Sequence, residues 1–439
     1  ANTTGIGNVA VGLSALKANT TANNNVALGT QTLETNTTGT QNTAIGNYAL
    51  NHNTTASNNL AVGYNTMNAN TTGSSNVGIG QFSLDANTTG GSNTALGHNA
   101  LTGNTTASNN TAVGKDALGL NTTGTQNTAL GGVSLDANTT GDANTALGYA
   151  TLGANTTGSS NVAIGDQALE ANTTADNNTA VGRRALEANT VGNHSTALGY
   201  NAGLLTTGSR NTWVGALCGD ANTGGTNSVG VGYAALTNST ASNCTAVGAS
   251  ALQSNTTGTE NTALGASALS VNNSGNYNNA FGNGALSTTT TGSHNIGLGR
   301  NAQATSATAN SQCTLGDDQI NNLRCNDTSI SSLSDSRDKT DVINSPYGLD
   351  FINTVRPVQF KWETRDGNIK DGSTRIGFLA QELLAATDGN NAVLDLVLDD
   401  NPDKLEAKYG NLLPIAIQAI QDLSAQVDAL TARITTLEG

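Results

Sequence analysis

Residues 144–160 read N-T-A-L-G-Y-A-T-L-G-A-N-T-T-G-S-S, and variants of this pattern follow one another along most of the chain. A column of 19 glycines marks the repeat, spaced 17 residues apart except for two steps of 16. A helical-hairpin repeat needs about 34 residues, so this unit is too short for one. The pattern therefore predicts an all-β solenoid or β-roll of 19 units over residues 1–316. The glycines stand at positions 12, 29, 46, 63, 80, 97, 114, 131, 148, 165, 182, 199, 215, 232, 248, 265, 282, 299 and 316.

Three columns around each glycine indicate how a coil would pack. The residue before the glycine is large and apolar, as in Val11 and Leu28, and we expect it to form an internal ladder. Two residues before the glycine stands nearly always Ala or Gly, as in Ala27, which predicts that another backbone passes close by. Leu or Met usually stands four residues after the glycine, as in Leu33 and Met67. The glycine itself suits a left-handed or crowded backbone.

Each coil is expected to hold two strand segments of roughly three to five residues, joined by two tight turns. Thr and Val in the N-T-A-L-G segment favour a strand, whereas N-T-T-G is turn chemistry because Asn tolerates the left-handed region. The asparagines that open the units, such as Asn8, Asn25, Asn42 and Asn59, are predicted to stack as an amide ladder rather than to bind glycans. At about 4.8 Å per coil, the rod would be about 90 Å long.

Composition excludes several classes of function. Of the 439 residues, 36% are hydrophobic but only 3% are aromatic, so a core of large side chains cannot form. The net charge of −14 argues against nucleic-acid binding, because that affinity comes from Lys and Arg. No apolar run approaches the roughly 18 residues of a membrane span, so we expect no membrane insertion. No cofactor is expected either.

The composition changes near the C-terminus, which divides the chain into different parts. All four prolines follow residue 334, and so do 10 of the 17 Lys and Arg residues. This change predicts two different kinds of structure joined by a linker. We expect a repeat shaft at 1–316, a linker at 317–333, a small α+β domain at 334–412 and a coiled coil at 413–439.

Some polar side chains of the repeat could carry chemistry, but each has a structural explanation. The acids Glu34, Asp85, Asp136 and Glu170 recur at one offset, whereas a glycosidase needs two carboxylates that converge at a fixed separation. We expect a solvated rim there. The Asn-x-Thr tripeptides match glycosylation acceptors, yet turn formation explains them. The four histidines lie far apart without ligand spacing, so we expect no metal site.

The stretch between residues 200 and 248 breaks the pattern. Trp213 replaces the small residue of the strand segment, and Gly203 and Gly219 replace the leucine. One hypothesis is that Trp213 fills a gap where the spacing of the repeat changes. The other is that Trp213 is a receptor contact, since an exposed tryptophan is a good anchor in an interface.

The four cysteines are Cys218, Cys244, Cys313 and Cys325. They form no Cys-x-x-Cys motif, so zinc and thioredoxin-like sites are not expected. Two alternatives stay open for them. Either Cys313 pairs with Cys325, or the thiols are free and buried.

The segment after residue 334 has the mixed pattern of a small α+β domain. Residues 347–351 read as a short helix, and residues 358–362 alternate as a strand. Asp366 and Gly367 signal a hairpin turn. Residues 375–383 read as a strand that runs into a helix.

An apolar stripe along the last residues predicts a coiled coil of about four heptads. Val and Ile at one heptad position with Leu at the other favour two strands. The small-residue column of the repeat instead favours three rods around one axis lined by alanine, and we expect a homotrimer. The stripe consists of Leu413, Ala416, Ile420, Leu423, Val427, Leu430, Ile434 and Leu437.

The Asn-x-Ala-Ile-Gly signature and its many copies resemble the head repeats of YadA-like trimeric autotransporter adhesins, a left-handed β-roll. The resemblance covers about residues 1–316, although the adhesin units are shorter than 17 residues. Similar repeats are found in phage and marine bacterial fibre proteins. The resemblance implies a trimeric fibre that attaches to a surface.

The C-terminal segments resemble the intramolecular chaperone domain of phage endosialidase tailspikes. The matching motifs are S-D-x-R-x-K at 334–339, F-K-W at 360–362 and G-F-L-A-Q-E at 377–382, followed by the terminal coiled coil. In that family the domain trimerises, guides the folding of the fibre ahead of it and then cuts itself off. The resemblance implies Ser334 as the nucleophile, Lys339 as the general base and a scissile bond between Leu333 and Ser334. A serine hydroxyl is weakly nucleophilic and needs such an adjacent base.

Two classes of function follow. The first is a homotrimeric fibre, extracellular, on a virion tail or at a cell surface, whose partner is a host-surface or environmental glycan or receptor. Its chaperone domain would be a single-turnover Ser-Lys autoprotease with no external substrate. The second is a tailspike enzyme that degrades a host polysaccharide, which the missing acid pair and the few aromatic residues disfavour. The identity of the receptor and a phage or bacterial origin are left open.

Overall fold

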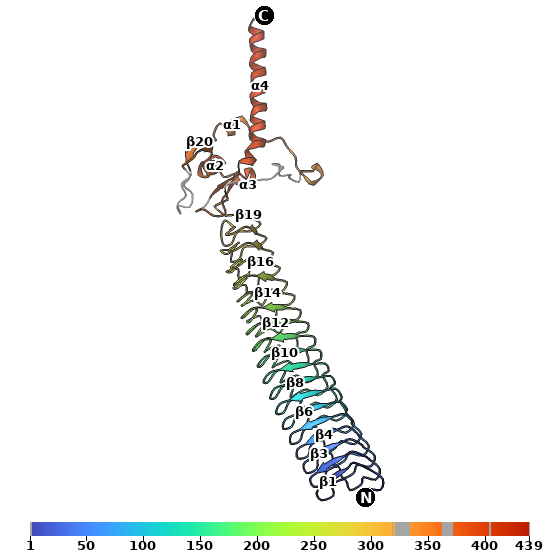
Figure 1. The fold of residues 1–439 in the computed structure, drawn as a ribbon. Helices are drawn as coiled ribbons and strands as arrows, with labels where there is room; N and C mark the ends of the chain where they lie inside the picture. Colours follow the sequence, from blue (N-terminus) through green and yellow to red (C-terminus); the bar gives the residue numbers. More distant parts are fainter. Residues whose placement is uncertain (1, 318, 321–333, 362–371, 404, 439) are drawn as a thin grey trace. The chain divides into compact units, whose positions relative to one another are not determined.

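The computed structural model describes residues 2–317, 319–320, 334–361, 372–403 and 405–438 (Figure 1). The chain forms two units, Ala1–Leu315 and Gly316–Gly439. The first unit is built from the repeat and the second from the mixed C-terminal segments. Each unit has its own hydrophobic core.

One short strand per repeat builds the first unit, and these strands form a single parallel sheet of 19 strands (Figure 1). Each strand pairs with that of the next repeat, as β1 (Val9–Val11) pairs with β2 (Val26–Leu28). The strands enclose about 18 turns of a β-solenoid, which confirms the predicted fold class. The other strands are β3 (Thr43–Ile45), β4 (Leu60–Val62), β5 (Val77–Ile79), β6 (Thr94–Leu96), β7 (Thr111–Val113), β8 (Thr128–Leu130), β9 (Thr145–Leu147), β10 (Val162–Ile164), β11 (Thr179–Val181), β12 (Thr196–Leu198), β13 (Thr212–Val214), β14 (Val229–Val231), β15 (Thr245–Val247), β16 (Thr262–Leu264), β17 (Asn279–Phe281), β18 (Ile296–Leu298) and β19 (Cys313–Leu315).

The register of the sheet follows the glycine column. Most neighbouring strands are offset by 17 residues. Two pairs are offset by 16, because Thr196 faces Thr212 and Val229 faces Thr245. Since the strands stay aligned residue by residue, each shortened repeat loses a residue from its turns rather than from its strand.

Two positions of the repeat line the interior: the small residue two before the glycine (the small column) and the Leu or Met four after it (the leucine column). The residue directly before the glycine does not. Middle strand residues such as Ala44 and Ala95 are fully buried, and so are Leu50 and Leu101. The residue before the glycine points outward, and Leu96 keeps 44% of its surface exposed. The predicted internal ladder is therefore wrong. In a three-residue strand the middle side chain takes one face and its two neighbours take the other. The middle one is buried, as in β6, where Ala95 is buried and Leu96 is exposed.

Gly78 shows how little room the small column has. A Cβ added at Gly78 would lie 2.8 Å from Met67 Cε and 2.8 Å from Thr66 Cγ2, both in the same chain. At Gly78 the crowding thus comes from side chains of the same solenoid, and the prediction of another backbone close by is wrong there. The predicted axis between three rods, lined by alanine, is wrong for the same reason.

In the part of the solenoid that the structure describes, the rest of each repeat consists of turns, so the prediction of two strands per coil is wrong. The backbone is left-handed two and four residues after the glycine, as in Gln31 (φ 56°) and Leu33 (φ 50°). Such a conformation costs a residue other than glycine roughly 1–2 kcal/mol. Hydrogen bonds between stacked turns offset this cost, since the Leu33 amide donates to the Ala49 carbonyl at 3.1 Å.

Two asparagine columns stack through the solenoid. In the predicted column, Asn42 Nδ2 donates to Asn25 Oδ1 at 3.2 Å. A second column lies in the N-T-T-G turns, where Asn104 Nδ2 donates to Asn87 Oδ1 at 2.8 Å and to the Ala107 carbonyl at 3.0 Å. The predicted amide ladder is confirmed, and the turn asparagines form another. Asn87 and Asn104 are fully buried, so the folded chain does not present them as glycosylation acceptors.

The glycine column requires glycine for two reasons. Gly29 has a φ of 136°, a region where other residues are strained. A Cβ added there would lie 2.7 Å from the carbonyl carbon of Gly46 in the next turn. The predicted left-handed and crowded backbone is confirmed.

The second unit combines short strands and helices with one long C-terminal helix (Figure 1). One antiparallel pair joins β20 (Val358–Lys361) to β21 (Thr374–Gly377), and another joins β22 (Val397–Leu398) to β23 (Glu406–Ala407). The helices are the 3-10 turn η1 (Ser336–Asp338), α1 (Leu349–Ile352), α2 (Ala380–Ala386), α3 (Asn391–Leu394), the 3-10 turn η2 (Tyr409–Asn411) and α4 (Leu412–Glu438).

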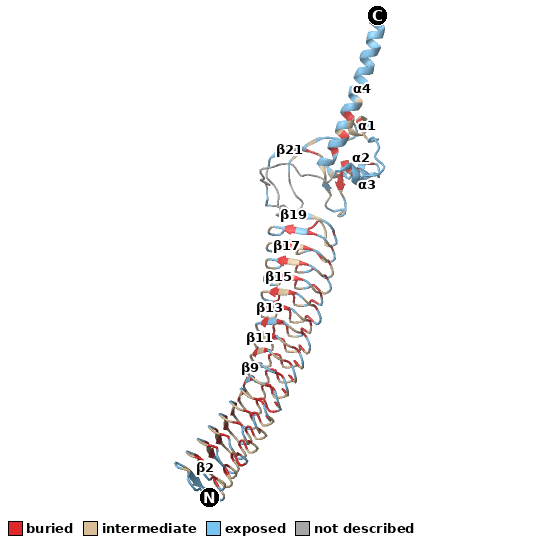
Figure 2. Ribbon diagram, turned by 90° about the vertical axis from the view of Figure 1, so that its right-hand side faces the viewer, coloured by how far each residue is buried: buried red, intermediate tan, exposed pale blue. Residues whose placement is uncertain are grey.

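Helix α4 has two different parts. Near its N-terminus, Leu412, Ile415 and Ala419 are buried against the rest of the unit. Farther along, the apolar stripe is exposed, from Ile420 at 68% to Leu437 at 84% (Figure 2). The long terminal helix is confirmed, and its pairing in a coiled coil stays a prediction.

The other elements predicted for this unit agree with the structure where it is described. A short helix forms at 349–352, a strand at 358–361, and a strand followed by a helix between 374 and 386. The turn at 366–367, Trp362, Cys325 and Leu333 lie outside the described residues. Among the described residues, no helix has both the length and the apolar content that a membrane crossing requires.

Candidate functional site

Ser334 and Lys339, the predicted nucleophile and base, are in direct contact. The Lys339 amino group donates to Ser334 Oγ at 2.7 Å across five positions of the chain. Both residues are exposed in the single chain. Leu333, on the other side of the predicted scissile bond, lies outside the described residues.

A single 3-10 turn, η1, makes this contact possible. Asp335 caps the turn, because its Oδ1 accepts the Arg337 amide at 2.9 Å and its carbonyl accepts the Asp338 amide at 3.1 Å. Lys339 leaves the turn in an extended conformation, with φ −124° and ψ 140°. Its amide donates to the Ser336 carbonyl at 3.3 Å. The chain therefore turns between the two functional side chains and lets them meet.

The Asp335 carboxylate also forms an ion pair with the Arg337 guanidinium. Arg337 Nε donates to Oδ1 at 3.0 Å, and Nη2 donates to Oδ2 at 2.6 Å. The contact with Arg337 lowers the pKa of Asp335, and the same contact raises the pKa of Arg337. Sequence reasoning missed this pair, although the opposite charges two residues apart in S-D-x-R-x-K could have indicated it.

Residues from both sides hold the G-F-L-A-Q-E motif in place. Arg356 Nε donates to Glu382 Oε2 at 3.0 Å, and this contact lowers the pKa of Glu382. The Phe378 amide donates to the Tyr409 hydroxyl at 3.3 Å, and the two rings meet edge to face at 5.4 Å. The motif is thus tied to the loop between α1 and β20 and to the turn η2 that precedes α4.

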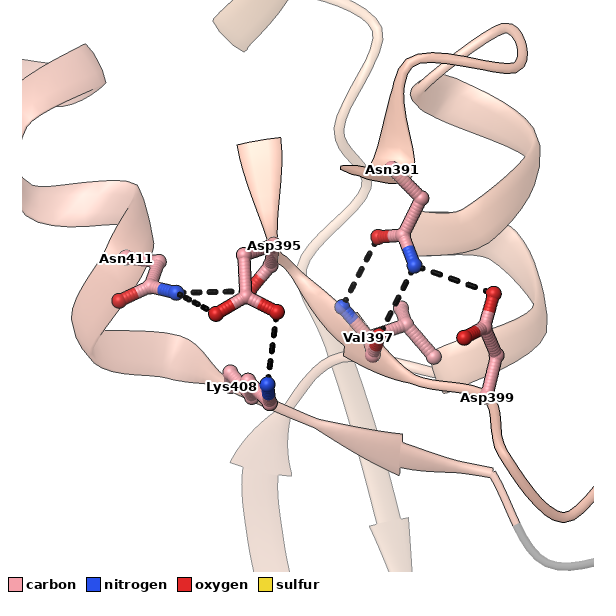
Figure 3. A network of polar contacts seen from close by, with 6 residues as sticks. All are labelled: Asn391, Asp395, Val397, Asp399, Lys408 and Asn411. Atoms are coloured by element: carbon pink, nitrogen blue, oxygen red, sulfur yellow. Dashed lines mark hydrogen bonds and ion pairs between the residues drawn. The ribbon is translucent and has the colours of Figure 1, made fainter. Parts of the chain in front are cut away.

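A polar network joins α3, β22 and η2 (Figure 3). Asn391 Nδ2 donates to the Val397 carbonyl at 2.9 Å, and Asn391 Oδ1 accepts the Val397 amide at 3.2 Å. Asp395, which is left-handed with φ 47°, accepts the Lys408 amino group on Oδ1 at 2.6 Å. Asn411 donates to the Asp395 carbonyl at 2.6 Å. These side chains satisfy one another and the backbone, which is a structural role.

Trp213 is fully buried inside the solenoid, so the hypothesis of a receptor contact at this residue is wrong. It occupies the middle position of β13, the position that faces the interior. A Cβ added at Gly203 would lie 2.5 Å from Trp213 Cδ1, and one at Gly219 would lie 2.5 Å from Cδ2. The indole fills the volume that two leucines occupy elsewhere, in agreement with the gap-filling hypothesis.

An open groove of about 820 Å³ lies on the solenoid beside Tyr149. It collects three acids that recur at the same offset from the repeat glycine, Asp136, Glu170 and Glu187. The repeat between the first two carries Gly153 at the acid position, which leaves the space open. The groove follows from the repeat, because residues at one offset stack along one side of the solenoid.

The carboxylates of this groove are either hydrogen-bonded to neighbouring side chains or partly buried. Gln167 donates to Glu170 at 2.8 Å, and Arg184 donates to Glu187 at 3.0 Å. Burial raises the pKa of Asp136. Within the described part of the chain, no group of three or more His, Cys, Asp or Glu residues is placed to hold a metal ion.

The cysteines divide by their surroundings. Cys218 and Cys244 are free and buried, as one of the two alternatives stated. Burial raises the pKa of the Cys218 thiol to about 12 and also raises the pKa of Cys244. Cys313 is exposed, and its predicted partner Cys325 lies outside the described residues, so that pairing stays a prediction.

Comparison with known proteins identifies the C-terminal part. Residues 334–394 match the family model described as chaperone of endosialidase. This match includes Ser334, Lys339 and all elements from η1 to α3. No curated protein and no solved structure is significantly similar to the chain. The chain therefore carries a β-solenoid followed in the sequence by a chaperone-of-endosialidase domain.

Proposed function

We propose that the chain is a subunit of a homotrimeric fibre, in which the solenoid is the shaft and the C-terminal domain is an intramolecular chaperone. The observation that carries this proposal is the chaperone-of-endosialidase match at residues 334–394. A domain of this kind follows, in the sequence, the fibre that it helps to fold. Here a solenoid of about 18 turns precedes it in the sequence. The fibre is extracellular or part of a virion.

The first support for self-association is an apolar ladder on the outer face of the solenoid. The third residue of every strand is apolar, and none of these residues is charged. Several are half exposed, including Leu130 at 44%, Leu198 at 48% and Leu298 at 51%. A neighbouring solenoid with the same rise per turn can cover this ladder along its whole length. Each Å² of apolar surface removed from water contributes about 25 cal/mol.

The second support is the apolar stripe of α4. Val427, Leu430 and Ile434 keep 53%, 54% and 53% of their surface exposed. Only the first turns of the helix pack against their own unit. Leucines and β-branched residues at steps of three and four are what a coiled coil buries. Two exposed apolar stripes on one chain favour association with further copies of that chain.

The mass of the intact assembly tests this part of the proposal, and we expect three chains. Leu423→Asp with Leu430→Asp should abolish the trimer, because the change places charges on the stripe of α4. Ala425→Asp with Ala432→Asp has the same spacing at exposed positions outside the stripe and is the matched control. A dimeric wild type, or a stripe variant that stays trimeric, would contradict the trimeric arrangement.

The proposal includes self-cleavage between Leu333 and Ser334. The distance of 2.7 Å between the Lys339 amino group and Ser334 Oγ is within the hydrogen-bond reach that a general base requires, and the neutral amine would accept the serine proton. Ser334 Oγ would attack the carbonyl of residue 333 and displace its own amide nitrogen. The resulting ester would be hydrolysed by water, which leaves a rod ending at Leu333 and a fragment beginning at Ser334. A lysine acts as a base in its neutral form, which desolvation favours, so we expect cleavage once assembly covers this exposed site.

Expression of the wild-type chain should therefore yield two bands on a denaturing gel. Ser334→Ala and Lys339→Ala should each yield one full-length band from chains that still assemble. Ser336→Ala, which changes an exposed serine in the same turn, is the control and should cleave normally. A fragment that begins at a residue other than Ser334, or one released from Ser334→Ala, would contradict the assignment.

The attachment role rests on the form of the fibre rather than on a particular residue. Its proposed partner is a host-surface or environmental glycan or receptor. Since Trp213 is buried, a contact surface has to be sought on the outer turns of the solenoid. The proposal also includes a relationship of the repeat to YadA-like head repeats. It further places the fibre on a phage tail or a cell surface.

A further inference from the structure

The course of the chain between Ser334 and Lys339 decides whether their side chains meet. Five extended residues would span up to about 17 Å. In the structure the Lys339 amino group instead lies 2.7 Å from Ser334 Oγ. The intervening segment is one 3-10 turn of three residues. An isolated turn of this length is not stable by itself, because fixing its backbone angles costs more than one hydrogen bond returns.

Asp335 supplies the additional contacts that this turn needs. Its Oδ1 accepts both the Arg337 backbone amide at 2.9 Å and Arg337 Nε at 3.0 Å. Its Oδ2 accepts Arg337 Nη2 at 2.6 Å. One carboxylate therefore fixes the backbone of the turn and the side chain of Arg337 together. A planar guanidinium is suited to this two-point contact, since its donors match the two oxygens of a carboxylate.

We propose that the Asp335–Arg337 pair is a positioning clamp for the self-processing site. The clamp fixes the turn η1, and the turn places the Lys339 amino group on Ser334 Oγ. The inference rests on the proposed function and deepens it. Asp335 and Arg337 are positioning residues, because they act through the turn and not on the bond that would be cut.

The exposure of the clamp separates this role from a role in stability. The Arg337 side chain is 86% exposed and the Asp335 side chain is 41% exposed. Exposed ion pairs contribute little to folding free energy. Loss of the clamp should therefore leave folding and assembly unchanged and disturb only the Ser334–Lys339 contact. Asp338 offers a matched control, since it is an exposed acid in the same turn and is outside the clamp.

The contact can be measured without any cleavage, through the reactivity of a thiol at position 334. In Ser334→Cys, the nearby amino group of Lys339 should favour the thiolate. The pH at which alkylation of Cys at this position by iodoacetamide is half-maximal, followed by peptide mass spectrometry, then reports the proximity of Lys339. Adding Lys339→Ala gives the reference without the amino group. We expect the half-maximal pH to be about one unit lower in Ser334→Cys than in this reference.

Adding Asp335→Ala to Ser334→Cys should raise the half-maximal pH to that of the Lys339→Ala reference. Adding Asp338→Ala should not raise it. The direct effect of removing a negative charge has the opposite sign, because it would favour the thiolate. A rise in the Asp335→Ala variant can therefore come only from the loss of the Lys339 contact. An unchanged or lowered half-maximal pH in that variant would overturn the clamp.

Cleavage gives a second measurement in the full-length chain. Asp335→Ala should slow release of the fragment about 100-fold, which is the order of effect that a small misplacement of reacting groups causes. Asp335→Asn keeps an oxygen for the turn amide but loses the ion pair, so its rate should lie between those of Asp335→Ala and the wild type. Cleavage of Asp335→Ala at the rate of Asp338→Ala would overturn the clamp. If the wild type releases no fragment, the proposed self-cleavage fails, and the thiol measurement still decides whether the clamp exists.

Discussion

Trp213 shows how one residue in this solenoid depends on its neighbours. The middle strand position otherwise holds small side chains, and an indole fits only because Gly203 and Gly219 lack side chains where other repeats carry leucine. In the next strand a Cβ at Gly230 would lie 2.9 Å from Trp213 Cε3. Trp213 Nε1 has no hydrogen-bond partner among the described residues. Since a buried unpaired donor costs about 1–3 kcal/mol, the packing of the indole has to exceed that cost.

Trp213→Ala should destabilise the solenoid by about 3–5 kcal/mol, because it leaves a cavity where the indole was. The regular repeat suggests a repair. Gly203→Leu and Gly219→Leu, added to Trp213→Ala, should recover most of the loss, since both glycines have φ near 60° and Leu33 tolerates φ 50° in the same column. Unfolding in urea, followed by circular dichroism, measures both effects. A triple variant no more stable than Trp213→Ala would show that the leucine column and the indole do not fill the same space.

The sequence indicated that residues 203, 213 and 219 change together, but it could not indicate which way they face. A three-residue strand has two faces, and the apolar third residue and the small middle residue are both compatible with an interior position. Only the closure of the coil decides between them. Apolar character favoured the residue before the glycine, whereas space inside the coil admits the small middle residue. The burial of Ala95 and the exposure of Leu96 reflect that limit on space.

At the scale of the elements, the asparagine columns connect successive turns in addition to the buried leucines that each turn contributes to the core. Both polar atoms of the Asn104 side-chain amide form hydrogen bonds. The amide donates to Asn87 Oδ1 and to the Ala107 carbonyl, and it accepts from Asn121 Nδ2 at 3.1 Å. The repeat therefore replaces part of a hydrophobic core with a buried polar ladder. The ladder is fully paired at Asn104, whereas farther along the column the Asn222 side chain and the Oδ1 atoms of Asn172 and Asn272 have no partner among the described residues.

Asn104→Asp should be strongly destabilising, by about 3 kcal/mol or more, because a carboxylate would face two acceptor oxygens without a proton to donate. Burial should raise the folded-state pKa of the new acid above its unfolded value. The penalty should thus be small below about pH 4 and should grow as the pH rises toward the folded-state pKa. Asn109→Asp, at an exposed position in the same turn, is the control. Equal unfolding midpoints for the two variants at pH 7 would contradict the ladder.

Part of the candidate site could be predicted and part could not, for a physical reason. Ser334 and Lys339 were predicted from a motif, and the structure places them in contact. The Asp335–Arg337 clamp was not predicted. Whether these two side chains meet depends on the backbone conformation of the turn between them, and not on the residue types alone. The second asparagine column was also not predicted. The sequence indicated that N-T-T-G forms a turn, but not that the period of 17 stacks the asparagines of successive turns.

At the scale of the whole molecule, the contacts of the solenoid join each turn to the next one. Stability in such an array is close to a sum over the units and their interfaces, so an incomplete or misregistered stack can persist. A parallel sheet whose strands differ little in sequence has many possible registers, each with similar local contacts. Such a fold benefits from an element that starts assembly in one register. The domain at residues 334–394 has the position and the family match to supply that start.

If that domain is a chaperone and then leaves, the mature rod should be held by a barrier to unfolding rather than by reversible equilibrium. Chains of Ser334→Ala, unfolded in guanidinium and then diluted, should regain trimers, because they keep the domain. Cleaved rods that end at Leu333, treated in the same way after removal of the fragment, should aggregate or remain unfolded. Light scattering and native mass measurement distinguish these results. Equal recovery from both samples would show that the solenoid finds its register alone, and the match at residues 334–394 would then describe a fold without a chaperone role.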